Sequence, residues 1–179
     1  KKILNIRKFM NRLNFLLNKK FISILKIKKK HIKFHSRYSA KARVYKYMIF
    51  NRDSVPSINK NRVWHIKKKI NLKNLKKGAK FLVGKKDFST FRASSCSANS
   101  PIRTLEKINI VKRNNQISIE FRSRSFLQTQ VRSMVGSLKY LGEGKWDLKK
   151  FKYVTLSKRR ELCAPPAPPH GLFLKKVIY

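Results

Sequence analysis

The sequence predicts an α+β fold with an antiparallel sheet flanked by helices. Three observations lead to this class. Predicted strands and helices mix along the chain without the strand–helix–strand rhythm of parallel sheets. Two alternating segments flank Asn114 and Asn115, as expected for a hairpin. One strong helical stripe follows them, and 179 residues suffice for a single domain with its own core.

Residues 1–33 are predicted to form a basic helix followed by a strand. Apolar residues recur at three- and four-residue steps, which predicts an amphipathic helix that packs on a sheet rather than on a membrane surface. The apolar run 21–27 predicts the strand, and a lysine cluster at 28–30 follows it. The stripe of the helix consists of Ile3, Ile6, Met10, Leu13 and Leu17.

Residues 34–179 are predicted to form the main part of the domain. Residues 43–50 alternate as in a strand, residues 51–66 carry the Asp, Pro, Ser and Asn of a loop, and the lysine-dense stretch 67–82 is helical up to Gly84. The predicted strand has one face formed by Arg43, Tyr45, Tyr47 and Ile49.

The C-terminal half carries the clearest elements. Residues 105–113 and 116–122 are predicted as the hairpin, a proline-rich loop spans 164–169, and a final strand spans 172–178. Between them, Ser125 is predicted to cap a helix that closes at Gly142. Its continuous stripe is Leu127, Val131, Met134, Leu138 and Leu141.

The charge balance requires a polyanionic partner. The chain has 46 Lys and Arg against 7 Asp and Glu, a formal net charge of +39, and no acid precedes Asp53. A phosphate backbone requires such a field, whereas an acidic small molecule does not. Because aromatics make up 11% of the chain, full disorder is not expected. The composition therefore predicts a folded protein that binds nucleic acid.

Other classes receive no support from the sequence. Cys96 and Cys163 lie far apart, and neither they nor the four histidines show a metal-ligand spacing. The sequence therefore predicts no structural metal site and no disulfide, and a reducing compartment is expected. No apolar run has the length of a membrane span. The acid-free N-terminus fits a matrix-targeting segment in charge but is rich in Lys rather than Arg and Ser. No helix-turn-helix or zinc-finger motif of a DNA-binding protein occurs.

Four segments, in order, resemble the tRNA pseudouridine synthase A (tRNA pseudouridine synthase I) family. They are FHSRYSAKARVYKY at 34–47, GKKDFSTFRASSCSANSPIR at 84–103, FLQTQVRSMVGSL at 126–138 and APPHGLFLKKVIY at 167–179. Together they cover nearly the whole chain from about Leu13 onward.

The resemblance implies a pseudouridine-synthase-type sheet with helices behind it and an RNA cleft. Family enzymes isomerise uridine in folded RNA: an aspartate attacks, and the base is detached, rotated and rejoined through carbon, without a metal or organic cofactor. Tyr45 matches the pocket tyrosine, Arg132 the arginine that pairs with the catalytic aspartate, and Leu172 the pocket wall. Without these family roles, Tyr45 would be a sheet residue packed in the core, and Arg132 would contact a phosphate or pair with another acid.

One departure from the family pattern concerns the nucleophile. The family's catalytic aspartate lies in an Arg-Thr-Asp-x-Gly loop, and no such string occurs here. Asp87 matches a different block and is expected to bond within a loop. The segment Gln128, Thr129 and Gln130 also stands where the family often has histidines and methionine. Since covalent catalysis needs its nucleophile, the chain as given is predicted to be an incomplete, inactive family domain with a vestigial pocket.

Eleven basic residues are candidate RNA contacts in this predicted pseudouridine-synthase-like RNA-binding domain, because Lys and Arg interleaved with aromatics suit phosphate contact and base stacking. They are Lys28, Lys29, Lys30, Arg37, Lys41, Arg43, Lys85, Lys86, Arg92, Arg103 and Arg132.

Two functional hypotheses follow. The first is a noncatalytic rRNA-binding component of an organellar ribosome, in the mitochondrial matrix or another organelle, beside other ribosomal proteins; the missing aspartate and the charge density favour it. The second is the C-terminal part of an active tRNA pseudouridine synthase, with tRNA as partner and the cytoplasm as the alternative location. The match of Tyr45 and Arg132 to the family pocket favours the second hypothesis. The first hypothesis is nevertheless preferred, because of the high density of positive charge and the missing aspartate.

Overall fold

The computed structural model describes residues 5–179, in two compact units, Lys1–Ser39 and Ala40–Tyr179. The sequence-based boundary after residue 33 stays a prediction. The first unit contains helix α1 (Ile6–Leu17) and the short 3₁₀ turn η1 (Asn18–Lys20). The Asn5 side chain caps α1 by accepting a hydrogen bond from the Lys8 N–H at 2.9 Å. The predicted helix is thus confirmed, although Ile3 lies outside the described residues.

Residues 21–27 form no strand, contrary to the sequence prediction. Phe21 ends η1 with a φ of 54° and is fully exposed. The backbone of Ile24 is instead held by one side chain: Asn14 Nδ2 donates to the Ile24 carbonyl and Asn14 Oδ1 accepts from its N–H. A strand requires a ladder of main-chain partners, which an apolar run alone does not provide.

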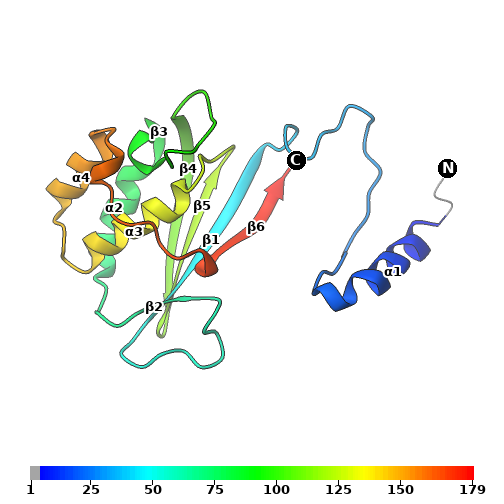
Figure 1. The fold of residues 1–179 in the computed structure, drawn as a ribbon, viewed down its shortest axis with the longest axis horizontal. Coiled ribbons are helices and arrows are strands. Elements are labelled where there is room, and N and C mark those ends of the chain that lie inside the picture. Colours follow the sequence, from blue (N-terminus) through cyan, green and yellow to red (C-terminus); the bar gives the residue numbers. More distant parts are fainter. Residues whose placement is uncertain (1–4) are drawn as a thin grey trace. The chain divides into compact units, whose positions relative to one another are not determined.

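The second unit is built on a six-stranded sheet of order β2–β1–β5–β4–β3, with β6 also paired to β1 (Figure 1). All pairs are antiparallel except β1 with β2, which is parallel. The sheet is therefore mixed, whereas the sequence predicted a purely antiparallel one. The strands are β1 (Ala42–Asn51), β2 (Trp64–Ile66), β3 (Gly84–Asp87), β4 (Ile102–Arg113), β5 (Gln116–Ser123) and β6 (Leu172–Ile178).

The hairpin of β4 and β5 confirms the sequence prediction, with Asn114 at φ 51° in its turn. Ile117, Ile119 and Phe121 of β5 are fully buried on one face, as the period-two pattern requires. They lie opposite Ile49, Tyr47 and Tyr45 of the central strand β1. The core therefore lies on this face of the sheet.

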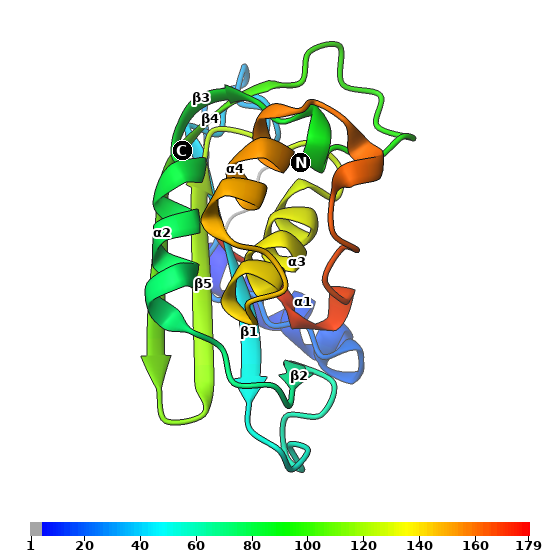
Figure 2. The same ribbon diagram turned by 90° about the vertical axis from the view of Figure 1, so that its left-hand side faces the viewer.

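Three helices cover the core face (Figure 2). They are α2 (Leu72–Leu82), α3 (Gln130–Gly142) and α4 (Leu148–Leu156). The stripe of α3 is buried as predicted. However, α3 begins at Gln130, not at Ser125, because the chain first turns back through a Thr129 with φ 66°. Strand β3 and helix α4, capped by Asp147, were not predicted.

Candidate functional site

A cavity of about 440 Å³ opens where β1, the start of β6 and the N-terminal end of α3 meet. Its walls are Tyr45, Leu172 and residues 126–132. Arg132 belongs to the last group, so the structure brings together the three pocket residues that the sequence suggested. Most small-ligand pockets measure about 300–1,000 Å³, so the cavity is large enough for a nucleotide.

Tyr45 forms an aromatic wall of this cavity. It is half-buried on the core side of β1, and its ring meets that of Phe126 edge to face, with centroids 5.2 Å apart and planes at 87°. Phe121 and Leu174 flank it across the sheet. The ring therefore packs against Phe126 and keeps contact with the cavity, which suits stacking against a base.

Arg132 is fixed by the proline-rich loop that precedes β6. Its Nε donates to the Ala167 carbonyl at 2.6 Å, and the Ala167 N–H donates back to the Arg132 carbonyl at 3.0 Å. Gly136 permits this contact, since a Cβ there would lie 2.0 Å from the Pro165 carbonyl oxygen. Within residues 5–179 no carboxylate pairs with Arg132. Its terminal nitrogens therefore remain for an occupant of the cavity.

Tyr47 lies beneath the same loop. Its hydroxyl donates to the Pro168 carbonyl at 2.7 Å, and the side chain is fully buried. Burial raises the pKa of Tyr47 above its ordinary value, and the positive charge of Arg132 partly opposes that shift. Tyr47 is thus a neutral anchor for the loop, whereas Tyr45 faces the cavity.

No acid lines the cavity, and all seven are placed elsewhere in the described chain. Asp87 caps the Ser89 N–H at 2.8 Å, the loop bonding expected of it, and Asp53 lies exposed in the loop after β1. The others form a helix cap or ion pairs: Asp147 with the Lys150 N–H, Glu106 with Arg122, Glu120 with Lys175, Glu143 with Lys139 and Glu161 with Arg159. The cavity alone therefore offers no carboxylate nucleophile.

Besides Arg132, three of the arginines predicted to contact RNA donate to main-chain carbonyls. Arg43 donates to Arg124, Arg92 to Cys96, and Arg103 to both Ser100 and Ile102. The Nε of Arg103 is buried without a partner in the described chain. These guanidinium groups stabilise loops, so they are less free for phosphate than the sequence suggested.

The other predicted RNA contacts, six lysines and Arg37, lie in two places. Lys28, Lys29, Lys30 and Arg37 are exposed in the first unit. In the second unit, Lys41 is exposed just before β1, and Lys85 and Lys86 lie on β3, the strand at the end of the sheet order. The Lys86 ammonium lies 5.0 Å from the centre of the Phe81 ring. None of these lysines lines the cavity.

Sequence reasoning noted Gln130 only as a departure from the family pattern and missed its place in the cavity wall. Gln130 is 1% exposed, and its Oε1 accepts from the Leu127 N–H at 2.8 Å. Cys96 does not line the cavity, but main-chain N–H groups of Ala98 and Gln128 lower the pKa of its thiol, with Ala98 the larger cause. A polar Gln130 beside the apolar stripe of α3 was the one available signal.

Among residues 5–179, no cluster of His, Cys, Asp and Glu could hold a metal ion. The described helices also include none long and apolar enough to cross a membrane.

Fold and cavity together define an α+β protein with an aromatic and cationic pocket against a helix N-terminus. The family model for tRNA pseudouridine synthase matches residues 79–179. The chain belongs to this family, which confirms the resemblance inferred from the sequence.

Curated relatives extend the match to the whole chain. A tRNA pseudouridine synthase A of Pelagibacter ubique is 61% identical over 179 residues, covering 100% of this chain and 73% of the relative. One of Bartonella tribocorum is 44% identical over 158 residues, 88% of this chain and 64% of the relative. One of Mesorhizobium japonicum is 42% identical over 146 residues, 82% of this chain and 59% of the relative. The chain thus spans about three fifths to three quarters of these proteins.

Proposed function

We propose that the chain is the C-terminal part of an active tRNA pseudouridine synthase, which converts uridine to pseudouridine in structured RNA. The observation that carries the proposal is the convergence of Tyr45, Arg132 and Leu172, from three separate elements, on one cavity of about 440 Å³. The names of the relatives support the same choice, and tRNA is therefore the favoured RNA.

The noncatalytic ribosomal hypothesis has weaker support. The relatives reported above carry the name of a tRNA-modifying enzyme and come from bacteria. They give no support to rRNA, to ribosomal protein partners or to an organelle. A net charge of +39 is compatible with tRNA as well as with rRNA, since both present a phosphate backbone. We therefore assign the protein to the bacterial cytoplasm.

The reaction exchanges one bond of the nucleoside for another. The bond from N1 of uracil to C1′ of ribose breaks, and a bond from C5 to C1′ forms. The hydrogen of C5 leaves as a proton and N1 gains one, so atoms and electrons balance without an oxidant or reductant. In this chain Tyr45 provides the ring against the base, and Arg132 provides the positive charge. We assign the nucleophilic carboxylate to a part of the protein outside this chain, because none lines the cavity.

The test is the release of tritium from a tRNA transcript labelled at C5 of uridine. The full-length gene product is expected to release tritium into water, whereas this chain alone is expected to release none. Absence of release by the full-length product, with sedimentation on ribosomal subunits that persists at high salt, would overturn the proposal and restore the ribosomal hypothesis.

A further inference from the structure

The N-terminal end of α3 faces the cavity with unused hydrogen-bond donors. The Gln130 N–H donates to the Leu127 carbonyl and the Ser133 N–H to the Thr129 carbonyl. Between them, the N–H groups of Val131 and Arg132 have no acceptor within residues 5–179, and the Thr129 side chain provides no cap. Such a helix end carries a partial positive charge and attracts anions.

Gln130 gives a second, independent indication of a ligand. Gln130 is only 1% exposed, and it is one of the residues that line the cavity. Its Oε1 is occupied by the Leu127 N–H, while its Nε2 has no partner in the described chain. An unpaired buried amide costs about 1–3 kcal/mol, so its persistence in a cavity wall is explained when an occupant accepts its hydrogen bond.

The chemistry of the donors selects a phosphate group. Main-chain N–H groups, an amide NH₂ and the guanidinium of Arg132 all donate, and no carboxylate among the lining residues opposes an anion. Helix N-termini with converging N–H groups are common phosphate sites. Arg132 also faces the carboxylate that the proposed function brings to the pocket, so the donors of Gln130 and Val131 remain for a second anion.

From this geometry we infer that the first turn of α3, with Gln130, binds the phosphate of the nucleotide whose base contacts Tyr45. The inference rests on the proposed function and specifies how the substrate is held there. Tyr45 and Gln130 lie on the wall of one cavity, so a single nucleotide can reach both. Sequence-independent capture of the phosphate would position the base without contributing to its recognition.

The first experiment needs no variant. The isotopically labelled chain is titrated with inorganic phosphate, with uridine and with uridine monophosphate, and amide signals are followed by NMR at constant ionic strength. We expect phosphate and the monophosphate to shift the Gln130 side-chain NH₂ and the Val131 main-chain N–H, and uridine to leave both unmoved. Phosphate shifts confined to exposed lysines would overturn the inference.

The second experiment uses Gln130→Glu, which keeps the acceptor for the Leu127 N–H but removes the NH₂ donors. We expect affinity for uridine monophosphate to fall about tenfold relative to affinity for uridine. The control Gln116→Glu makes the same charge change on β5, away from the cavity. Equal losses in both variants would contradict a local phosphate site.

Failure of this inference can be told apart from failure of the proposed function. If the full-length enzyme carrying Gln130→Glu releases tritium with unchanged KM and kcat, the phosphate site is refuted while the activity stands. If the full-length wild type releases none, the proposed function fails, whatever the chain's affinity for phosphate.

Discussion

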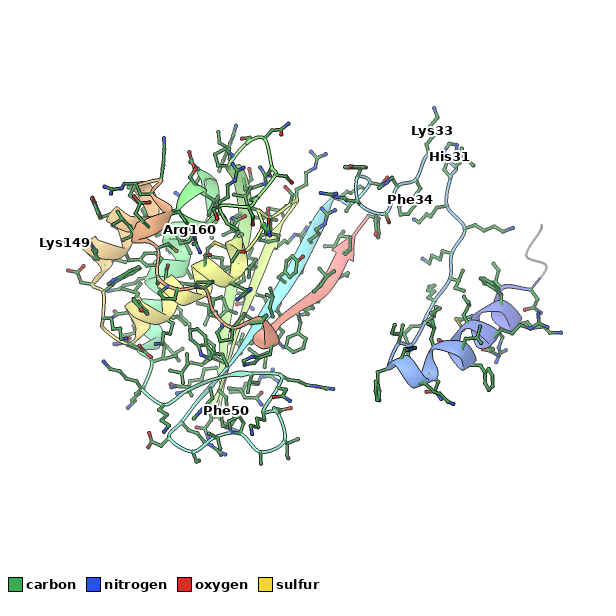
Figure 3. All side chains as sticks on the ribbon, viewed as in Figure 1. His31, Lys33, Phe34, Phe50, Lys149 and Arg160 are labelled. Carbon is green, nitrogen blue, oxygen red and sulfur yellow. The ribbon has the colours of Figure 1, made fainter. Side chains whose placement is uncertain are left out.

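Arginines and lysines have different roles in the second unit, although each side chain carries one positive charge. Arg132, Arg92 and Arg160 donate to carbonyls of the loops around α3. The lysines of α2 and α4 are mostly exposed and pair with no acid in the described chain. In Figure 3, Lys149 lies at the outer side of α4, whereas Arg160 lies inside the helix layer.

The difference follows from the two side chains. A planar guanidinium has five donors in a fixed fork and can bond several carbonyls at once, whereas an ammonium is a compact, strongly hydrated charge on a flexible stem. Arg132 therefore lines the cavity while Arg92 and Arg160 hold nearby main-chain segments, and the lysines of α2 and α4 place positive charge on the exposed sides of those helices. Substitutions at the two kinds of residue should separate effects on chemistry and stability from effects on RNA attraction.

The largest effect is expected from Arg132→Met in the full-length enzyme. Removing a preorganised charge beside the reacting group should lower kcat for tritium release by about 10²–10³-fold. The control Arg122→Met removes an exposed arginine paired with Glu106, on a strand outside the cavity, and should retain nearly full activity. An equal loss of kcat in both variants would show that the reaction depends on the overall positive charge rather than on an arginine at position 132.

A stability effect of about 2 kcal/mol is expected for Arg160→Met, because its Nη1 donates to the Thr90 carbonyl and to the Ser133 hydroxyl. Its neighbour Arg159 pairs with Glu161 at the surface. Arg159→Met should therefore leave the free energy of unfolding nearly unchanged. Urea unfolding of the chain measures both, and equal changes would contradict a specific role for Arg160.

A smaller loss, about 1 kcal/mol, is expected for Tyr47→Phe, which removes the bond to Pro168. Its pH dependence is informative. Because the folded-state pKa of Tyr47 is raised above 10.0, its contribution to stability is full below pH 10 and declines as the pH rises above it. The difference in unfolding free energy between wild type and Tyr47→Phe should therefore shrink above pH 10, and a constant difference would refute the assignment.

The sequence predicted those parts of the fold that depend on local pattern. The hairpin around Asn114 and the stripe of α3 depend on period and turn chemistry, and both are confirmed. The run 21–27 did not form a strand because pairing requires a partner elsewhere in the chain. The parallel pairing of β2 with β1 was missed for the same reason, since it depends on a loop that carries no periodic signal.

The cavity was predictable only in part. The resemblance indicated Tyr45, Arg132 and Leu172, and the structure places them around one cavity. It did not indicate that Arg92 and Arg103 donate to carbonyls, because those acceptors are main-chain atoms and any sequence provides them. The unpaired amide of Gln130 likewise follows from three-dimensional burial, not from residue type.

The smallest effect is expected from the lysines, and it tests the other half of the comparison. Lys76 and Lys80 are exposed on α2, so Lys76→Gln with Lys80→Gln should leave the unfolding free energy nearly unchanged. If both contact phosphates, the plot of log K for tRNA against log salt should become less steep by about 1–2, since each lost contact removes about 0.7–0.9 of a counterion. The matched Lys→Arg pair keeps the charge and should keep the slope. An unchanged slope in the Gln pair would mean that these two lysines contact no phosphate, and that the RNA attraction comes from other basic residues of the chain.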